Sequence, residues 1–186
     1  MHTKEELGPL FPLVGTWEGN EGRDVAFSHE QGEVIETPFF ERVTFSSFGP
    51  VDNGSQVLFG LDYRMAAWKD RNDDPFHTEV GYWLWDASAN QLMRCFMVPR
   101  GVVVIAGGTT SADSTSFTLS AQVGAEDYGL LQNRYLLGRA KTSAYEVKIT
   151  TSEDSWSYAE TTMLRMNELD ELLAHTDSNT LRRVDS

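Results

Sequence analysis

Alternation of residues with a period of two is the dominant pattern in this chain. From Val57 to Met65, large apolar residues occupy every second position, and the positions between them include Gly60, Asp62 and Arg64. The same period recurs at 39–46, 76–85 and 144–149. Successive side chains of a β-strand point to opposite faces, so each segment predicts a strand with two distinct faces.

Further strands are predicted from shorter apolar stretches. Turn sequences such as Asp86–Asn90 separate them, and the 15 glycines are spread along the chain. About ten strands joined by short turns predict an antiparallel meander, and closure of a meander into a barrel removes its exposed edges. We therefore expect an all-β fold, an up-and-down antiparallel β-barrel of about ten strands. The additional strands are expected at 14–19, 91–98, 101–107, 115–122, 132–137, 155–165 and 178–184.

Two short helical segments are predicted beside the strands. Thr3 and Glu6 have the spacing of a capping box, and apolar residues then recur at helical spacing up to Val14. Two prolines limit this helix to one or two turns, so we expect it to cap or flank one end of the barrel. The second helix is predicted at Asn167–Ala174, with Asn167 as its cap and three leucines as its apolar stripe.

Composition and charge restrict the class of protein and its partners. A chain of 186 residues suits a single domain, 1–186, and 40% hydrophobic with 23% charged residues is typical of globular proteins. The 28 acidic residues outnumber the 15 basic residues and give a net charge of -13. Nucleic acid and anionic membrane surfaces both favour a basic partner, so neither is expected here.

The single cysteine and the apolar runs also exclude several classes. Cys95 alone cannot form an internal disulfide or a multi-cysteine metal site, and its place in a predicted strand favours a buried structural thiol. The first residues contain no apolar signal-peptide core, and the longest apolar run, Val102–Ala106, is too short to span a membrane. We therefore expect a cytoplasmic protein; the oligomeric state is left open.

Two histidines are candidates for ligand or cofactor binding. His77 shares a strand face with Glu79, Trp83 and Trp85, so an inward orientation would place imidazole and carboxylate together in an aromatic cavity. The alternative is a hydrogen-bonded histidine at a strand end. His175 lies between the second predicted helix and the last predicted strand. It is either a cofactor ligand, with Asp177 or a backbone carbonyl holding its second nitrogen, or a helix-terminal histidine favoured by the helix dipole.

The other candidate groups carry weaker signals. His2 is terminal and His29 lies in a polar turn, so both are expected to be solvated. Glu41 shares a strand face with Phe39 and Val43, which makes it either a polar group in a pocket or a marker of the exposed face. No nucleophile elbow, phosphate loop or histidine pair for zinc occurs in the sequence.

Four stretches in order along the chain resemble the nitrobindin family. The first is Leu10–Gly19, whose Gly-Thr-Trp after a short helix is also similar to lipocalin-like and fatty-acid-binding-protein-like barrels, where the Trp packs across the closed end. The second is Pro75–Tyr82, with a His-x-Glu-x-Gly-Tyr pattern that begins at His77. The others are the strand pair at 92–106 and the late histidine, His175. Nitrobindins are ten-stranded barrels that hold haem b, and they include the C-terminal domain of a human THAP-type protein.

The resemblance implies a site and an activity. It makes His175 the proximal ligand of the haem iron and places His77 in the wall of the pocket. It further implies nitric oxide binding and isomerisation of peroxynitrite to nitrate. The chain departs from the family at Asn20–Phe27, where the usual Tyr-Pro-Thr-Ile is missing, and after His175, so it looks like a divergent branch.

A metal-free carrier or sensor of a small apolar ligand is the alternative interpretation. An aromatic and methionine-rich barrel interior fits such a ligand as well as it fits haem. The two interpretations differ at His175, because a carrier needs no imidazole there. Whether the chain is an enzyme depends on the same choice.

Overall fold

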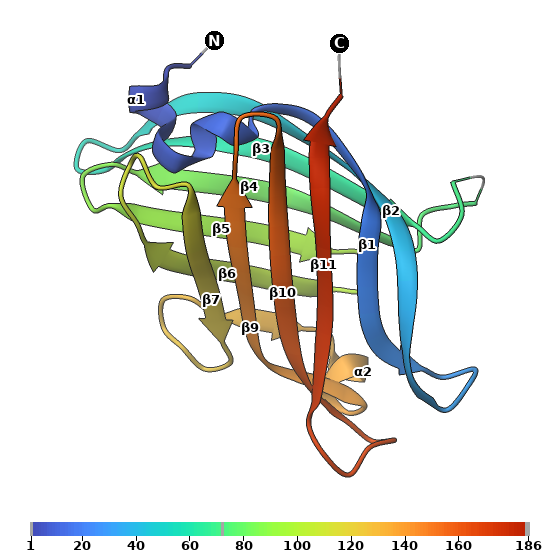
Figure 1. Ribbon diagram of the computed structural model, residues 1–186. Coiled ribbons are helices and arrows are strands. Elements are labelled where there is room, and N and C mark those ends of the chain that lie inside the picture. The colour runs from blue at the N-terminus through green and yellow to red at the C-terminus, as the bar shows by residue number, and fades with distance from the viewer. Residues whose placement is uncertain (1, 72, 185–186) are drawn as a thin grey trace.

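The computed structural model describes residues 2–71 and 73–184, and these fold into one closed antiparallel β-barrel (Figure 1). Ten strands form the ring in the order β5-β4-β3-β2-β1-β11-β10-β9-β7-β6, and β6 returns to pair with β5. The predicted all-β fold with about ten antiparallel strands is therefore confirmed. The strands are β1 (Gly15–Ser28), β2 (Glu33–Asp52), β3 (Val57–Trp68), β4 (His77–Asp86), β5 (Gln91–Val98), β6 (Val102–Thr109), β7 (Ser116–Gln122), β8 (Leu130–Gln132), β9 (Ala140–Thr151), β10 (Ser155–Met166) and β11 (Leu173–Arg183).

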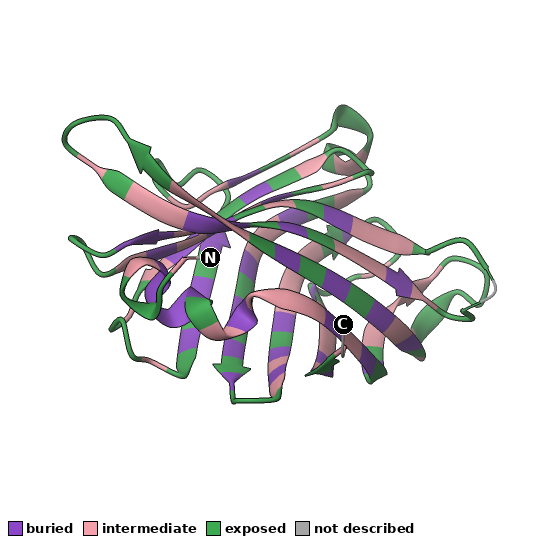
Figure 2. Cartoon of the chain, turned by 90° about the horizontal axis from the view of Figure 1, so that it is seen from above, coloured by how far each residue is buried: buried purple, intermediate pink, exposed green. Residues whose placement is uncertain are grey.

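The predicted alternation sets which side chains fill the barrel. On β3, Leu61 and Tyr63 are buried while Asp62 and Arg64 are exposed. Figure 2 shows the same banding of buried and exposed residues along the neighbouring strands. Burial of one apolar face per strand is the main contribution to the stability of this fold.

A short helical segment closes one end of the barrel. It consists of α1 (Lys4–Leu7) and the 3-10 helix η1 (Gly8–Leu13). The predicted capping box is present, because the Thr3 hydroxyl accepts from the Glu6 amide and the Glu6 carboxylate accepts from the Thr3 amide. Three leucines of the segment and Trp17 are fully buried, and the Trp17 indole donates to the Leu13 carbonyl at 2.7 Å. The segment therefore plugs this end, as the sequence predicts.

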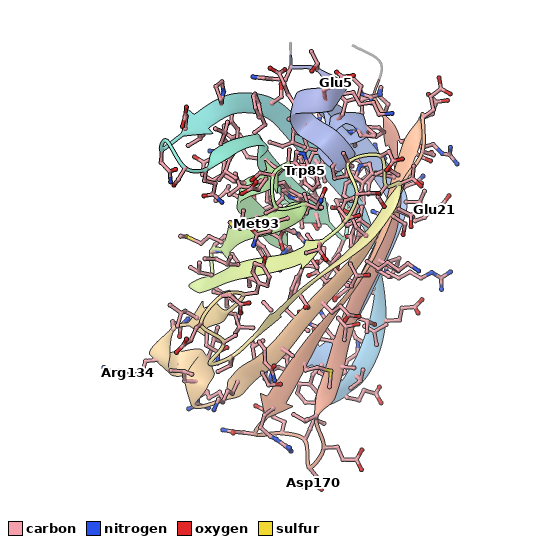
Figure 3. The ribbon with its side chains drawn as sticks, turned by 90° about the vertical axis from the view of Figure 1, so that its left-hand side faces the viewer. Glu5, Glu21, Trp85, Met93, Arg134 and Asp170 are labelled. Carbon is pink, nitrogen blue, oxygen red and sulfur yellow. The ribbon has the colours of Figure 1, made fainter. Side chains whose placement is uncertain are left out.

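Gly8 fixes the junction between α1 and η1. Its φ of +52° lies in the region that favours glycine, and a Cβ atom there would lie 2.6 Å from the Trp85 indole nitrogen. Figure 3 shows Trp85 beneath this helical segment. Only glycine allows the plug to sit this close to the indole ring.

The helix predicted at Asn167–Ala174 is wrong. Residues 167–172 form turns and bends, and β11 already begins at Leu173. The Asn167 side chain donates to the Gly138 carbonyl at 2.9 Å, so its amide holds the neighbouring loop and does not cap a helix. His175 consequently lies inside a strand and not at a helix end.

The strand predicted at 132–137 is also replaced. β8 ends at Gln132, and residues 134–137 form the four-residue helix α2 (Arg134–Leu137). The Asn133 side chain caps this turn by accepting from the Leu136 amide at 3.1 Å. Both α-helices in the described part of the chain have four residues, so neither could cross a membrane.

Candidate functional site

A cavity of about 440 Å³ occupies the barrel between the plugged end and the end that carries α2. Its outer part is mainly apolar, and its inner part carries most of the buried charged groups of the chain. Side chains from nearly every strand of the ring contribute to it. The apolar residues of the outer part are Phe27, Phe39, Phe76, Val98, Val102, Leu136, Leu164, Met166 and Leu173.

His175 lies on the cavity wall near the outer end of β11. Its Nε2 atom lies 2.7 Å from Oδ1 of Asp24 on the adjacent strand β1, and the imidazole is 31% exposed. The neighbouring strand β10 pairs with it through Thr162. No hydrogen bond of the other ring nitrogen, Nδ1, is found among the described residues. Asp24 thus holds one nitrogen in place of the expected Asp177 or backbone carbonyl, and the second nitrogen is available to a ligand.

His77 lies on a different wall of the same cavity. It begins β4, four strands away from β11 in the ring of ten, and its Nε2 atom is 3.2 Å from Oε1 of Glu79. Burial alone would lower the pKa of His77, but the hydrogen bond and the charge of Glu79 outweigh it and raise that pKa. The predicted pairing of imidazole and carboxylate on one strand face is therefore present.

A buried ionic cluster lies deeper in the barrel. The Arg94 guanidinium donates to Glu79 at 2.5 Å and to Glu160 at 2.6 Å, and the hydroxyls of Tyr63 and Tyr145 complete its surroundings. Burial would raise the pKa of Glu79, but the charge of Arg94 and the His77 hydrogen bond lower it to about 2. The positive charge of Arg94 is thus neutralised by two carboxylates.

Glu41 forms a second polar group in the cavity. The Tyr158 hydroxyl and the Asn179 amide both donate to its Oε2 atom, at 2.9 and 3.0 Å. Burial raises the pKa of Glu41 to about 7, and these two hydrogen bonds offset only part of that rise. Of the two alternatives that the sequence leaves open, Glu41 is the pocket group, because its face of β2 points inward.

Asp177 lies between two other carboxylates. In the strand register it is opposite Asp24 on β1 and opposite Glu160 on β10. Asp24 contacts His175 and Glu160 contacts Arg94, whereas no hydrogen bond or ion pair of the Asp177 side chain is found within 2–71 and 73–184. Burial and the neighbouring carboxylates raise the pKa of Asp177.

Three other predicted residues lie outside this inner group. His2 is not solvated as expected, because its ring nitrogens contact the Ser47 hydroxyl at 3.0 Å and the Gly49 carbonyl at 3.1 Å. His29 is exposed as expected, although it borders the mouth of the cavity. Cys95 is half-buried and lies on the outer face of β5, so the expected burial in the core is wrong.

Most of the residues in the ionic cluster are not predicted as site residues from the sequence. Arg94 shares its strand face with Leu92 and Phe96, and a charged residue among inward apolar positions signals a buried ion pair. Glu160 has a similar position between Tyr158 and the half-buried Thr162. Asp24 carries no such local signal, because only the pairing of β1 with β11 brings it to His175.

A family model described as "THAP4-like, heme-binding beta-barrel domain" matches residues 6–183. Among solved structures, "Crystal Structure of Rv2717c from M. tuberculosis" has a TM-score of 0.68 at 20% identity, over 97% of this chain and 98% of that chain. No curated protein matches this sequence. At this identity the structural likeness shows a shared fold.

Proposed function

Because the chain belongs to the THAP4-like, heme-binding beta-barrel domain family, we propose that it holds haem b in the barrel cavity with His175 as the axial ligand of the iron. The resemblance of the sequence to nitrobindins is confirmed by this membership, and haem is the cofactor of the family.

The hydrogen bonding of the two ring nitrogens of His175 is the observation that supports the proposal. Histidines that bind metals usually have their second nitrogen held by a carboxylate or carbonyl, which fixes the ring and makes it a stronger ligand. Asp24 holds one nitrogen of His175 in this way, and the other has no partner among the described residues. The donor set therefore fits an axial ligand of haem iron.

The surrounding wall also fits a haem macrocycle. Its outer part is built from aromatic and aliphatic side chains, which suit a large apolar ring. Arg100, in the turn between β5 and β6, borders the mouth and offers a positive charge to the carboxylates of such a ring. When bound, haem would supply the redox and ligand-binding chemistry of its iron. The protein would orient the ring and keep bulk water away from its face.

We further propose that the bound form binds nitric oxide and isomerises peroxynitrite to nitrate. His77 is the residue that would contact the small ligand, because it lies on a different wall of the cavity from His175. Its raised pKa favours the protonated imidazole, which donates a hydrogen bond to an anionic oxygen. Isomerisation leaves the atoms and the charge of the anion unchanged, so it requires no further reductant.

The buried charges argue against the carrier alternative for anionic apolar ligands such as fatty acids. The carboxylate of such a ligand, if it entered the deep part of the cavity, would need a free cation. Both terminal nitrogens of Arg94, however, are already bound by Glu79 and Glu160. It would also approach Glu41 and Asp177, whose carboxyl groups offer it no positive charge. Haem requires no such deep anion site.

Reconstitution with hemin tests the proposed ligand. The wild-type protein is expected to take up hemin with the absorption spectrum of histidine-ligated haem, and His175→Ala is expected to lose that spectrum while keeping the far-ultraviolet circular dichroism of the barrel. His29→Ala is the matched control, since it removes a histidine that borders the same mouth. Equal hemin uptake and equal spectra for wild type and His175→Ala would refute the role of His175.

Stopped-flow decay of peroxynitrite tests the proposed reaction. The hemin-loaded protein is expected to accelerate the decay with nitrate as the product, whereas the apoprotein is expected to have no effect. His77→Gln is expected to slow the decay and leave the haem spectrum unchanged, because His77 would act on the small ligand and not on the iron. A loaded protein that leaves the decay rate unchanged would refute the isomerase activity but not haem binding.

A further inference from the structure

A groove of about 330 Å³ lies on the outer face of the adjacent strands β2, β3 and β4. Ala66 of β3 is its central position, because it pairs with Arg42 on β2 and with Thr78 on β4. Arg64 and Trp68 flank Ala66 along β3, since residues two apart on a strand share a face. The small alanine side chain thus lies among four larger ones, and this difference in size forms the groove.

The two charged side chains that point into the groove are both arginines, among the residues that the structure describes. Arg64 is two residues away from Ala66, the partner of Arg42, so the two arginines are diagonal neighbours on one face. Diagonal neighbours in a sheet lie ~7–8 Å apart, which is within reach of long side chains. Glu79 also borders the groove, but its carboxylate lies inside the barrel and binds Arg94. Two guanidinium groups can therefore approach one anion in this groove.

Neither arginine is strongly neutralised by a carboxylate. Arg42 contacts Glu18 on β1 at 3.6 Å, but the two side chains are 54% and 32% exposed, so solvent weakens this ion pair. No hydrogen bond or ion pair of the Arg64 side chain is found within 2–71 and 73–184. Asp62 is the next outward residue of β3, on the side of Arg64 away from Ala66. The arginines thus lie between the groove and these two carboxylates, which makes the groove a positive site in a chain with a net charge of -13.

Trp68 supplies a flat apolar wall beside the two arginines. Its ring packs against Phe40 with the ring centroids 5.6 Å apart, and the Arg71 guanidinium lies 3.6 Å from the Phe40 centroid on the same side of the groove. Thr44 and Thr78 add hydroxyl groups to the lining. The groove therefore combines donors for the oxygens of an anion with an aromatic surface for a ring.

We propose that this groove binds a small aromatic phosphate. Two guanidinium groups match the several oxygens of a phosphate and hold it with charge-assisted hydrogen bonds. The indole of Trp68 stacks against the ring that carries the phosphate. A volume of about 330 Å³ is at the small end of ligand pockets and suits one ring with its phosphate. The site lies outside the barrel, so it does not depend on the haem proposed for the cavity.

A phosphorus NMR titration with phenyl phosphate tests the groove. The full-length protein is expected to bind this probe with a Kd of ~0.1–1 mM, which is typical of a ligand of its size. Arg64→Ala is expected to weaken binding ~10-fold or more, because it removes a charge-assisted hydrogen bond to the phosphate. Arg134→Ala is the matched control and is expected to bind like the wild type. It removes the same charge from the exposed helix α2, which Figure 3 shows at the end of the barrel away from the plug.

Trp68→Leu separates the contribution of the ring from that of the phosphate. This variant keeps both arginines but loses the flat wall, so it is expected to bind phenyl phosphate more weakly and inorganic phosphate as the wild type does. The same titration with each of the two probes measures both affinities. Equal affinity of wild type and Trp68→Leu for phenyl phosphate would contradict the stacked ring.

Three further results would overturn the proposal. One is a wild-type protein that does not bind phenyl phosphate at ~10 mM, well above the expected Kd. Another is equal affinity of wild type and Arg64→Ala, which would place the binding elsewhere. The third is equal weakening by Arg64→Ala and Arg134→Ala, which would assign the effect to net charge. Far-ultraviolet circular dichroism of each variant separates loss of binding from loss of the fold.

Discussion

Glu41 makes the stability of the apoprotein depend on pH in a direction opposite to that of an ordinary surface carboxylate. Its pKa is about 7 in the folded state, because burial penalises the charged form, against an ordinary value of 4.5. The folded protein therefore keeps the proton after the unfolded chain has released it. Stability contributed by Glu41 is complete below pH 4.5, falls as the pH rises towards 7, and is gone above it.

The size of the effect follows from the two pKa values. A rise from 4.5 to about 7 corresponds to about 3 kcal/mol of unfolding free energy, since one unit is worth about 1.4 kcal/mol. Glu41→Gln keeps an oxygen that accepts from Tyr158 and Asn179 but has no proton to lose. The variant is therefore expected to be more stable than the wild type at pH 8, with a difference that shrinks by about 2–3 kcal/mol between pH 8 and pH 5.

Urea unfolding of the apoproteins between pH 5 and pH 8 measures this difference. The difference between wild type and variant isolates Glu41 from the other groups that titrate in the same range. Glu146→Gln, on the exposed face of β9, is the matched control and is expected to follow the wild-type profile. A difference between wild type and Glu41→Gln that stays constant from pH 5 to pH 8 would refute the reasoning.

Three further substitutions test other parts of the structure. Arg94→Met is expected to cost about 3–5 kcal/mol of unfolding free energy at pH 7, measured by urea titration, because it leaves its two carboxylates buried without a cation; a loss below 1 kcal/mol would contradict the buried ion pairs. Gly81→Ala is expected to lower the melting temperature sharply, because its Cβ would lie 2.0 Å from a backbone oxygen of β5, whereas Gly138→Ala meets nothing closer than 3.7 Å and is expected to be tolerated. Equal melting temperatures for both variants would contradict that packing. Asp24→Asn is expected to weaken hemin binding about 10–100-fold by absorption titration without abolishing it, because it removes the charge that holds His175; unchanged affinity would show that Asp24 does not support the ligand.

The alternation of apolar and polar residues predicts the strands, but it does not predict which side chains of different strands come into contact. Leu61, Asp62 and their neighbours alternate strictly, so their faces are readable from the residues alone. The pair His175–Asp24 joins positions 151 residues apart, and Arg94–Glu160 joins positions 66 apart. Such contacts depend on the register of strands across a closed ring, which no local pattern encodes.

The two wrong predictions of secondary structure can be compared. The leucines near 169–173 have helical spacing, but the Asn167 amide bonds across to Gly138 and the chain turns back into the sheet. Around 132–137 an apolar run resembles a strand, but the Asn133 cap favours a helical turn. In both places a side-chain hydrogen bond accompanies the observed structure. The Asn167 bond depends on the position of a distant loop, whereas the Asn133 cap is local and contradicts the strand prediction from within the segment.

The plug formed by α1 and η1 determines how molecules enter and leave the barrel. With that end filled by leucine and tryptophan side chains, molecules reach the cavity from the end that carries α2 (Figure 1). A haem held by His175 and a small ligand that contacts His77 would therefore share that entrance.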